Sequence, residues 1–210
     1  MKRLLNIFVS SIGAGLLISI GGFVYLALKD VNQYLGAFLF SIGLLVIISF
    51  GLYLYTGKVG YIFDNKKNFL LDLLVCYFGN LCGAVSSGYI LRLVRNNYFE
   101  VAEKVVKMKI DDNIGSILIL SVFCGMLIYL AVDIQKREVS NIVKALGIIL
   151  PVMVFILSGF EHCVANMFYI SYANYWSLKA VLYIVIMSLG NGVGSLIIWG
   201  IMRLSKKINQ

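Results

Sequence analysis

Apolar residues along this chain form six long runs separated by short polar connections. A helix of about 20 residues crosses about 30 Å of hydrocarbon, so each run is long enough to span a membrane. The pattern predicts an all-α membrane protein with six transmembrane helices in a single transmembrane domain over 1–210. The runs are roughly 4–28, 34–63, 69–91, 113–133, 141–170 and 177–202.

Two of these runs, 34–63 and 141–170, are too long for a simple span. Each contains an interruption, "GLYLYTGKVG" at 51–60 and "SGFEHCVANM" at 158–167. Non-helical backbone is tolerated at membrane depth only where it lies against protein or lines a water-filled cavity. The second and fifth helices are therefore expected to be broken near the midplane.

Glycines accompany both interruptions. Gly57 and Gly60 flank Lys58, and we expect the first break there, followed by a short half-helix. Gly159 is expected to let the chain leave the helix at the second break, with a new half-helix near Cys163. Two half-helix N-termini that meet at the midplane would favour an anion.

A short motif occurs once in each half of the chain. "YFGNLCGAVSSG" at 77–88 and "SLGNGVGSLIIWG" at 188–200 both carry G-N-x-x-G, with Asn80 and Asn191 separated by 111 positions. The offset predicts two three-helix repeats, approximately 4–91 and 113–202. Three spans per repeat would insert the two copies in opposite orientations, a plan that is common in transport proteins.

The composition agrees with a membrane protein and excludes other classes. Hydrophobic residues make up 60% of the chain and charged residues 13%, against about a quarter charged in soluble domains. The net charge of +8 does not indicate nucleic-acid binding, because the basic residues cluster at the ends of the apolar runs. The four cysteines have no C-x-x-C spacing, so neither a metal site nor a cofactor is predicted.

The basic residues also predict orientation. With both termini in the cytoplasm of a multi-pass protein of the cell membrane, nine Lys and Arg lie inside and two outside, apart from the 92–112 loop. That loop contains "YFEVAEKVVKMKI", which predicts an amphipathic helix at the outer surface, either a solvated connector or an attractor of anions. The inside set is Lys2, Arg3, Lys66, Lys67, Lys136, Arg137, Arg203, Lys206 and Lys207, and the outside set is Lys29 and Lys179.

Few ionisable residues lie within the apolar runs. They are Lys58 at the first break, Lys144 in the fifth span, and Glu161 with His162 at the second break. Such residues are costly in a membrane and usually mark a pathway for ions or protons. His162 is the single histidine of the chain, and we expect it to face a pore.

These segments resemble the formate/nitrite transporter family. The resemblance rests on "GFEHCVANMFYI" at 159–170, on the two G-N-x-x-G stretches and on "SIGLLVIISFGLYLYTG" at 41–57. It implies a homopentamer in membrane lipid with one pore per subunit. The implied substrates are small monovalent weak-acid anions of the formate, nitrite or hydrosulfide class.

The resemblance also implies roles for individual residues. His162 would be the pore histidine between two apolar constrictions, with Thr56 facing it. Leu54 together with Phe155 matches the cytoplasmic-side slit, and Leu44 matches a residue of the periplasmic-side constriction.

Further residues correspond to the broken fifth helix and its surroundings. Lys144 matches a lysine in the outer part of the fifth span, and Glu161 and Asn166 would hold the broken backbone together. Two positions depart from the family pattern. Gly125 stands where many members have an asparagine bonded to the histidine, and Lys58 stands where many have a small or hydroxyl residue.

Neutralising the anion is the expected way across an apolar constriction. A bare ion faces a desolvation cost of up to tens of kcal/mol. Protonating an acid of pKa about 4 near pH 7 costs only about 4 kcal/mol. We therefore expect protons to accompany the anion, with Lys144 and the half-helix ends attracting it and His162 supplying or relaying a proton.

Two other functions compete with this interpretation. An aquaporin-like channel for neutral solutes would share the six-span plan, but it would normally carry N-P-A at both breaks, and the chain has neither. A membrane enzyme using Glu161 and His162 as acid and base would need a nucleophile, cofactor or metal set that the sequence does not offer. We therefore expect no enzymatic activity.

Overall fold

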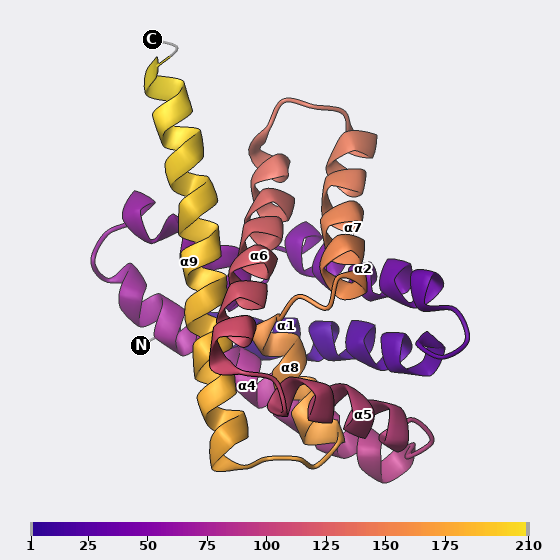
Figure 1. The fold of residues 1–210 in the computed structure, drawn as a ribbon. Helices are drawn as coiled ribbons and strands as arrows, with labels where there is room; N and C mark the ends of the chain where they lie inside the picture. The colour runs from indigo at the N-terminus through magenta and orange to yellow at the C-terminus, as the bar shows by residue number, and fades with distance from the viewer. Residues whose placement is uncertain (1, 209–210) are drawn as a thin grey trace.

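The structure is a computed structural model that describes residues 2–208, and within this range it contains helices and no strands. The predicted all-α class is therefore confirmed (Figure 1). The elements in chain order are α1 (Lys2–Leu28), α2 (Gln33–Ser49), α3 (Tyr55–Lys58), the 3-10 helix η1 (Val59–Asp64), α4 (Phe69–Val94), α5 (Phe99–Ile110), α6 (Ile114–Asp133), the 3-10 helix η2 (Ile134–Lys136), α7 (Asn141–Leu157), α8 (Cys163–Tyr172) and α9 (Leu178–Ile208).

Four helices, α1, α4, α6 with η2, and α9, are long and apolar enough to cross a membrane. The other two predicted spans are each divided into a 17-residue apolar helix and a shorter helix that follows a break. These are α2 followed by α3, and α7 followed by α8. Both breaks expected from the sequence are therefore present.

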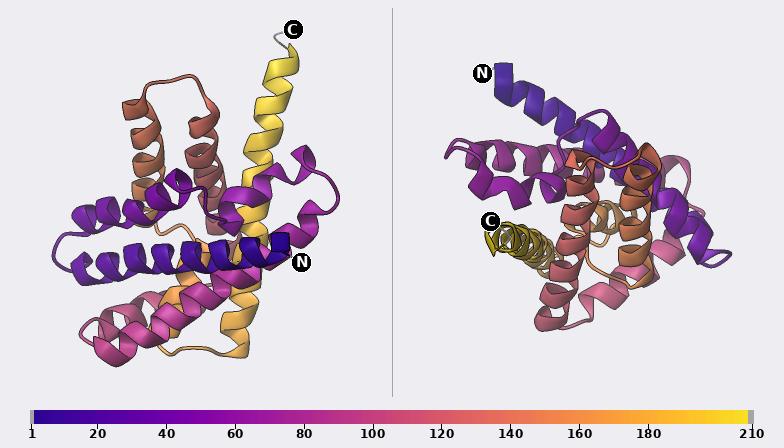
Figure 2. Two further views of the ribbon diagram at one scale, coloured as in Figure 1. Left: turned by 180° about the vertical axis from the view of Figure 1, so that it is seen from behind. Right: turned by 90° about the horizontal axis from the view of Figure 1, so that it is seen from above.

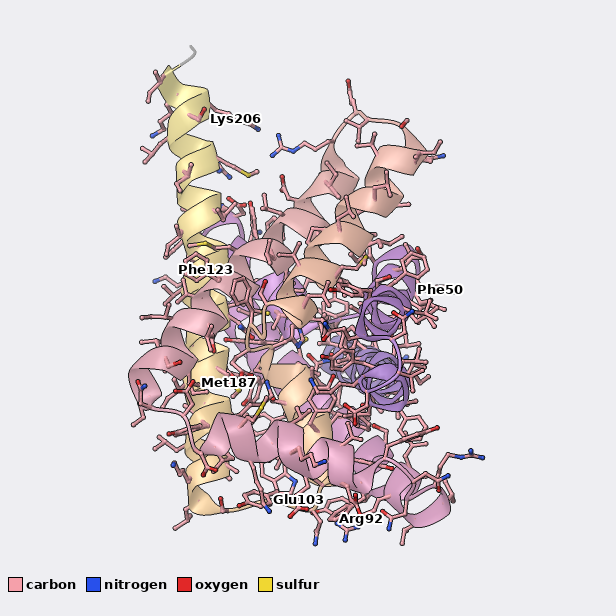
Figure 3. All side chains as sticks on the ribbon, turned by 45° about the vertical axis from the view of Figure 1, so that its right-hand side comes forward. Phe50, Arg92, Glu103, Phe123, Met187 and Lys206 are labelled. Atoms are coloured by element: carbon pink, nitrogen blue, oxygen red, sulfur yellow. The ribbon has the colours of Figure 1, made fainter. Side chains whose placement is uncertain are left out.

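Polar and apolar side chains are separated along the long dimension of the molecule. Figure 3 shows Lys206 at one end, Arg92 and Glu103 at the other, and Phe50 and Phe123 between them on the outside. Phe50 and Phe123 are 76% and 47% exposed. An apolar outer belt between two charged ends is the arrangement that a bilayer requires.

The two halves use the same helix contacts. α1 packs against α2 and α4 in the first half, and α6 packs against α7 and α9 in the second. The halves also interlock, because α2 contacts α7 and α8 contacts α4. Figure 2 shows α8 enclosed by helices of both halves.

Equivalent glycines set the spacing of the long helices. A Cβ atom added to Gly83 of α4 would overlap the carbonyl oxygen of Ile12 in α1. One added to Gly194 of α9 would overlap that of Val122 in α6 in the same way. Small residues at such crossings let membrane helices approach closely. The matching positions support the predicted three-helix repeat.

Asn80 holds the backbone at the first break. Its Oδ1 accepts a hydrogen bond from the backbone N–H of Tyr55 at 2.8 Å, at the start of α3. Its Nδ2 donates to the carbonyl oxygens of Tyr53 at 2.9 Å and Ser11 at 2.8 Å. One buried side chain thus satisfies three backbone groups where the helix is interrupted.

Asn191 makes the matching contacts at the second break. Its Oδ1 accepts from the N–H of Cys163 at 3.0 Å, at the start of α8. Its Nδ2 donates to the carbonyl oxygens of Glu161 and Ser121, both at 2.8 Å. The asparagines of the repeated sequence motif therefore have the same structural role in both halves.

A glycine with positive φ lies at each break. Gly159 has φ +68°, as expected from its place before the half-helix. At the first break the corresponding residue is Gly51, with φ +66°. The assignment of Gly57 to this break is wrong, because Gly57 is buried inside α3 and Lys58 is the last residue of that helix. Left-handed backbone at a helix end favours glycine, and only Gly51 has that conformation here.

We expect Asn191→Leu to destabilise the fold. The change leaves buried backbone groups of Cys163, Glu161 and Ser121 without partners, and each such group costs about 1–3 kcal/mol. Thermal unfolding of the protein in detergent should show a markedly lower midpoint. Asn141→Leu, at an exposed position in α7, is the matched control. Equal midpoints for the two variants would contradict the bridging role.

Candidate functional site

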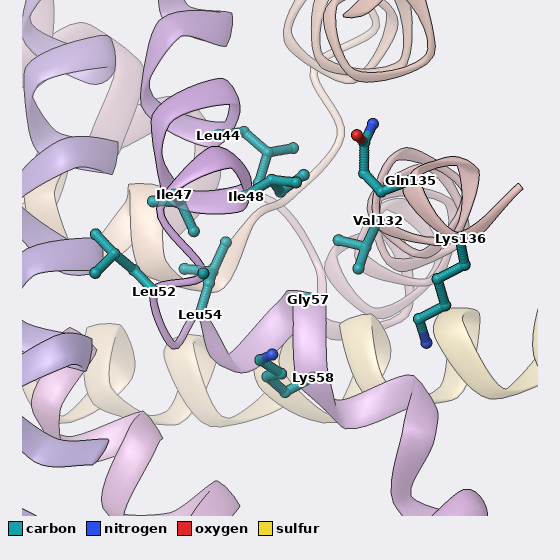
Figure 4. Close-up of a pocket in the computed structure, with 11 residues that line it drawn as sticks. Leu44, Ile47, Ile48, Leu52, Leu54, Gly57, Lys58, Val132, Gln135 and Lys136 are labelled. Atoms are coloured by element: carbon teal, nitrogen blue, oxygen red, sulfur yellow. The ribbon is translucent and has the colours of Figure 1, made fainter. Parts of the chain in front are cut away.

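Two pockets approach the centre of the molecule, and the contact between Thr56 and His162 lies between them. The first, here called the α5 pocket, has a volume of about 290 Å³, and the second, the η2 pocket, about 180 Å³ (Figure 4). Residues lining the α5 pocket include Tyr25, Lys29, Lys109, Phe155, His162 and Tyr169. Residues lining the η2 pocket include Leu44, Leu54, Gly57, Lys58, Val132 and Lys136.

The hydrogen bonds of His162 determine its protonation state. The residue caps α8, is 2% exposed, and accepts the backbone N–H of Ala165 on Nδ1 at 3.1 Å. A ring nitrogen that accepts a hydrogen bond carries no proton, so the ring is neutral and its proton lies on Nε2. Nε2 is 2.9 Å from Oγ1 of Thr56, to which it donates. The structure therefore brings these two residues together as expected.

This tautomer does not require an asparagine at position 125. A Cβ atom on Gly125 would overlap the carbonyl oxygen of Asn191, so α6 has no room for a side chain there. The backbone N–H of Ala165 fixes the ring of His162 instead. The departure from the family pattern at Gly125 reflects the close contact between α6 and α9.

Apolar side chains lie on both sides of His162, but their pairing differs from the expectation. Phe155 stacks on the imidazole of His162 with ring centroids 5.7 Å apart, and it contacts Phe40 edge-on at 5.8 Å. Leu44 and Leu54 both line the η2 pocket. Leu54 therefore pairs with Leu44, and Phe155 lies on the α5 side with Phe40. Phe40 and Leu44 are about one helical turn apart in α2, so their side chains lie at successive depths along the helix axis. Phe40 therefore pairs with Phe155, and Leu44 pairs with Leu54.

The carboxylate of Glu161 is neutralised by a lysine that the sequence interpretation did not assign to the site. Nζ of Lys109, in α5, donates to both carboxylate oxygens at 2.7 and 2.8 Å. Nδ2 of Asn166 donates to Glu161 at 2.8 Å and to the carbonyl oxygen of His162 at 3.0 Å. Glu161 and Asn166 therefore do contact each other across the break. The sequence offers one signal for this contact, a carboxylate in an apolar run that needs a cation, but Lys109 is 52 residues away from Glu161 in the chain.

Lys144 is not part of this cluster. It lies near the beginning of α7, where Nε2 of Gln135 donates to its backbone carbonyl oxygen at 3.1 Å. At a rise of 1.5 Å per residue, it is about 20 Å along the helix from Leu157 at the break. It lines neither the α5 pocket nor the η2 pocket. Because α7 starts at the η2 end, Lys144 lies at that end of the molecule and away from the α5 pocket.

The half-helix N-termini are not open anion sites either. Side chains of Asn80 and Asn191 occupy the N–H groups of Tyr55 and Cys163, and His162 occupies that of Ala165. α3 also has only four residues, too few for a substantial dipole. The basic groups at the two pockets are lysine side chains, Lys29 and Lys109 at the α5 pocket and Lys58 and Lys136 at the η2 pocket.

Comparison with known proteins identifies relatives along nearly the whole chain. The family model described as formate/nitrite transporter matches residues 1–205. The chain is 31% identical over 153 residues to the uncharacterized transporter YrhG of Bacillus subtilis, covering 67% of this chain and 58% of that protein. It is 30% identical over 148 residues to the formate channel BtFdhC of Bacillus thuringiensis, covering 65% and 57%. The matches thus span less than two thirds of these relatives' length.

A solved structure has the same fold. A pentameric formate channel with formate bound superposes with a TM-score of 0.83 at 24% identity, covering 99% of this chain and 98% of that one. The relatives are described as channels or transporters and not as enzymes, in agreement with the expectation from the sequence. The chain belongs to the formate/nitrite transporter family.

Proposed function

We propose that this chain forms a transmembrane path for small monovalent weak-acid anions of the formate, nitrite or hydrosulfide class. The observation that carries the proposal is a neutral imidazole, held by hydrogen bonds, that lines the α5 pocket and contacts Thr56, whose chain neighbours Leu54 and Gly57 line the η2 pocket. The α5 and η2 pockets approach this point from opposite ends of the molecule. Formate channels among the relatives support the substrate class.

Neutralisation of the substrate is the central step of the proposed mechanism. The side chains that separate the two pockets, Leu44, Leu54 and Phe155, are apolar and buried. A bare anion loses its hydration there, whereas protonating an acid of pKa about 4 near pH 7 costs about 4 kcal/mol. The substrate is expected to cross in its protonated form and to lose the proton on the far side.

The geometry of His162 favours a hydrogen-bonding role over direct proton transfer. If Nε2 gave its proton to the substrate, Nδ1 would have to gain one in the same step. That would break the hydrogen bond from the N–H of Ala165. In the proposed mechanism the ring therefore stays neutral and keeps its orientation. The hydroxyl of Thr56 turns away so that Nε2–H can donate to the substrate, while the proton that neutralises the anion comes from solution.

The proposal also includes the oligomeric state of the protein and its orientation in the membrane. The chain is placed in the cell membrane as a homopentamer with one path per subunit, supported by the pentameric assembly of the structural relative. Both termini are placed in the cytoplasm on the distribution of basic residues. The η2 pocket then opens to the cytoplasm, and the α5 pocket opens to the outside.

Two substitutions at His162 separate hydrogen bonding from proton transfer. His162→Gln keeps an N–H donor that does not titrate, so we expect formate flux into liposomes to persist with the wild-type pH dependence. His162→Phe removes the donor, and the loss of a hydrogen bond to the neutral acid, worth about 0.5–1.5 kcal/mol, should lower flux by about two- to tenfold. Flux is measured over a series of pH values.

Each outcome at His162 has a distinct meaning. A flattened pH dependence in His162→Gln would show that the ring itself carries the proton, and the neutral-donor mechanism would be wrong. Formate flux equal to wild type in His162→Phe would show that the histidine has no role in transport.

A second prediction concerns the ion pair between Lys109 and Glu161. Lys109→Met leaves a carboxylate that is 3% exposed without its cation, and breaking a buried pair in this way costs about 3–5 kcal/mol. We expect a lower thermal midpoint in detergent and partial recovery in the double variant with Glu161→Gln. Lys107→Met, which breaks the exposed pair with Glu103 on the same helix, should have little effect. A double variant no more stable than Lys109→Met would contradict the ion pair's role.

A further inference from the structure

The η2 pocket contains two lysines that are not neutralised by a carboxylate. Within residues 2–208, neither Lys58 nor Lys136 takes part in an ion pair. Each ammonium lies over an aromatic ring instead. Nζ of Lys58 is 4.8 Å from the ring centroid of Tyr53, and Nζ of Lys136 is 3.3 Å from that of Tyr61. Figure 4 shows the two lysines reaching the pocket from different elements, α3 and η2.

The nearest acidic residues are already neutralised. The carboxylate of Asp133 accepts from Nε of Arg137 at 3.0 Å and from the hydroxyl of Tyr61 at 3.2 Å. Asp64 is paired with Arg203 and accepts from the indole N–H of Trp199 at 2.9 Å. Both carboxylates thus have their own cations, and the positive charges at the η2 pocket remain.

The α5 pocket is different. Of its two lysines, Lys109 is bound to Glu161, and Lys29 lies near the hydroxyl of Tyr25 at 3.3 Å. The carboxylate cancels one of the two charges. The two ends of the path therefore differ, with two uncompensated cations at the η2 pocket and one at the α5 pocket.

An aromatic partner suits a lysine that must bind a passing anion. A carboxylate would occupy the ammonium N–H donors and compete directly with a small anion. A ring face attracts the cation by about 0.5–2 kcal/mol and offers no charged acceptor. Tyr53 and Tyr61 can therefore hold Lys58 and Lys136 in position while their donors stay free for an anion.

The position of the pair connects it to the proposed path. Lys58 is two residues after Thr56 in α3, and Leu54 precedes the same helix and lines the pocket. The other walls are largely aliphatic, including Leu44 and Val132, so an anion held here would already have lost part of its water. A compact, weakly hydrated monovalent anion fits these properties better than a strongly hydrated divalent one.

We propose that Lys58 and Lys136 form a capture site for small monovalent anions at the η2 end, which gives the two ends of the path unequal anion affinity. The inference rests on the proposed anion path and adds the residues that make its ends different. Anions arriving from the η2 side saturate the path at lower concentration than anions arriving from the α5 side.

The test compares the two ends in liposomes of one orientation. The C-terminal end of α9 and the connection from α6 to α7 lie at the same end of the molecule (Figure 1). A tag after residue 210 therefore allows vesicles with the η2 end outward to be separated from those with the α5 end outward. The initial rate of formate uptake gives a half-saturating concentration for each end. The variants are Lys58→Met with Lys136→Met, Lys58→Arg with Lys136→Arg, and Lys144→Met.

The expected result is specific to one end. Removing both charges with methionine should raise the half-saturating formate concentration at the η2 end about tenfold and leave the α5 end unchanged. The arginine pair should keep the wild-type values. Lys144→Met is the matched control, since it removes a half-buried lysine near η2 that lines neither pocket.

Other results would overturn the inference. One such result is a methionine pair whose half-saturating formate concentration at the η2 end is unchanged or rises equally at both ends. Another is the same rise at the η2 end in Lys144→Met. If the methionine pair does not fold, Lys58→Gln and Lys136→Gln provide the same comparison singly.

Calorimetric binding of formate to the purified protein separates this inference from the proposed function. Wild-type protein that conducts no formate, nitrite or hydrosulfide would refute the anion path. If the wild-type protein does not conduct but does bind formate, loss of that binding in the Lys58→Met, Lys136→Met variant would still support the capture site. Binding by this variant equal to that of the wild type would refute the capture site as well.

Discussion

The hydrogen bonds from two buried asparagines to interrupted backbone are the constraint on which the rest of this structure depends. Within a membrane, neither lipid nor bulk water can satisfy the N–H and C=O groups that a broken helix exposes. Asn80 and Asn191 each satisfy three of them. Because these contacts are made, the chain can stop being helical twice, and only then can Thr56 and His162 meet at the centre.

The same bonds determine where the positive charge of the site resides. The first N–H groups of α3 and α8 are occupied, so the helix ends can contribute little to attracting an anion. In the proposed function, lysine side chains have that role. Lys109 enters from outside the repeat pattern, on α5, and compensates Glu161. Glu161 in turn accepts from Asn166, so a charge that would repel an anion becomes part of the scaffold.

Sequence patterns predicted features that arise from local chain properties. Long apolar runs predicted the helices, Gly159 predicted a break, and the repeated G-N-x-x-G predicted two related halves. Contacts between elements that are far apart in the sequence could not be predicted in this way. Nothing local shows that Lys109 folds back onto Glu161, or that Leu44 pairs with Leu54 and not with the opposite constriction. The misplaced first break has a similar cause, since the sequence places glycines at both 51 and 57 and does not show that Gly51 is the one with positive φ.

The hydrogen bond between Thr56 and His162 joins the two repeats, since one residue belongs to each half. Rocking of one half against the other would break this bond and slide α8 along α4, with which it interlocks. An alternating-access cycle would therefore have to separate elements that this bond holds together. Under the proposed function, this architecture favours movement of substrate through a nearly static protein, with only side chains rotating as it passes.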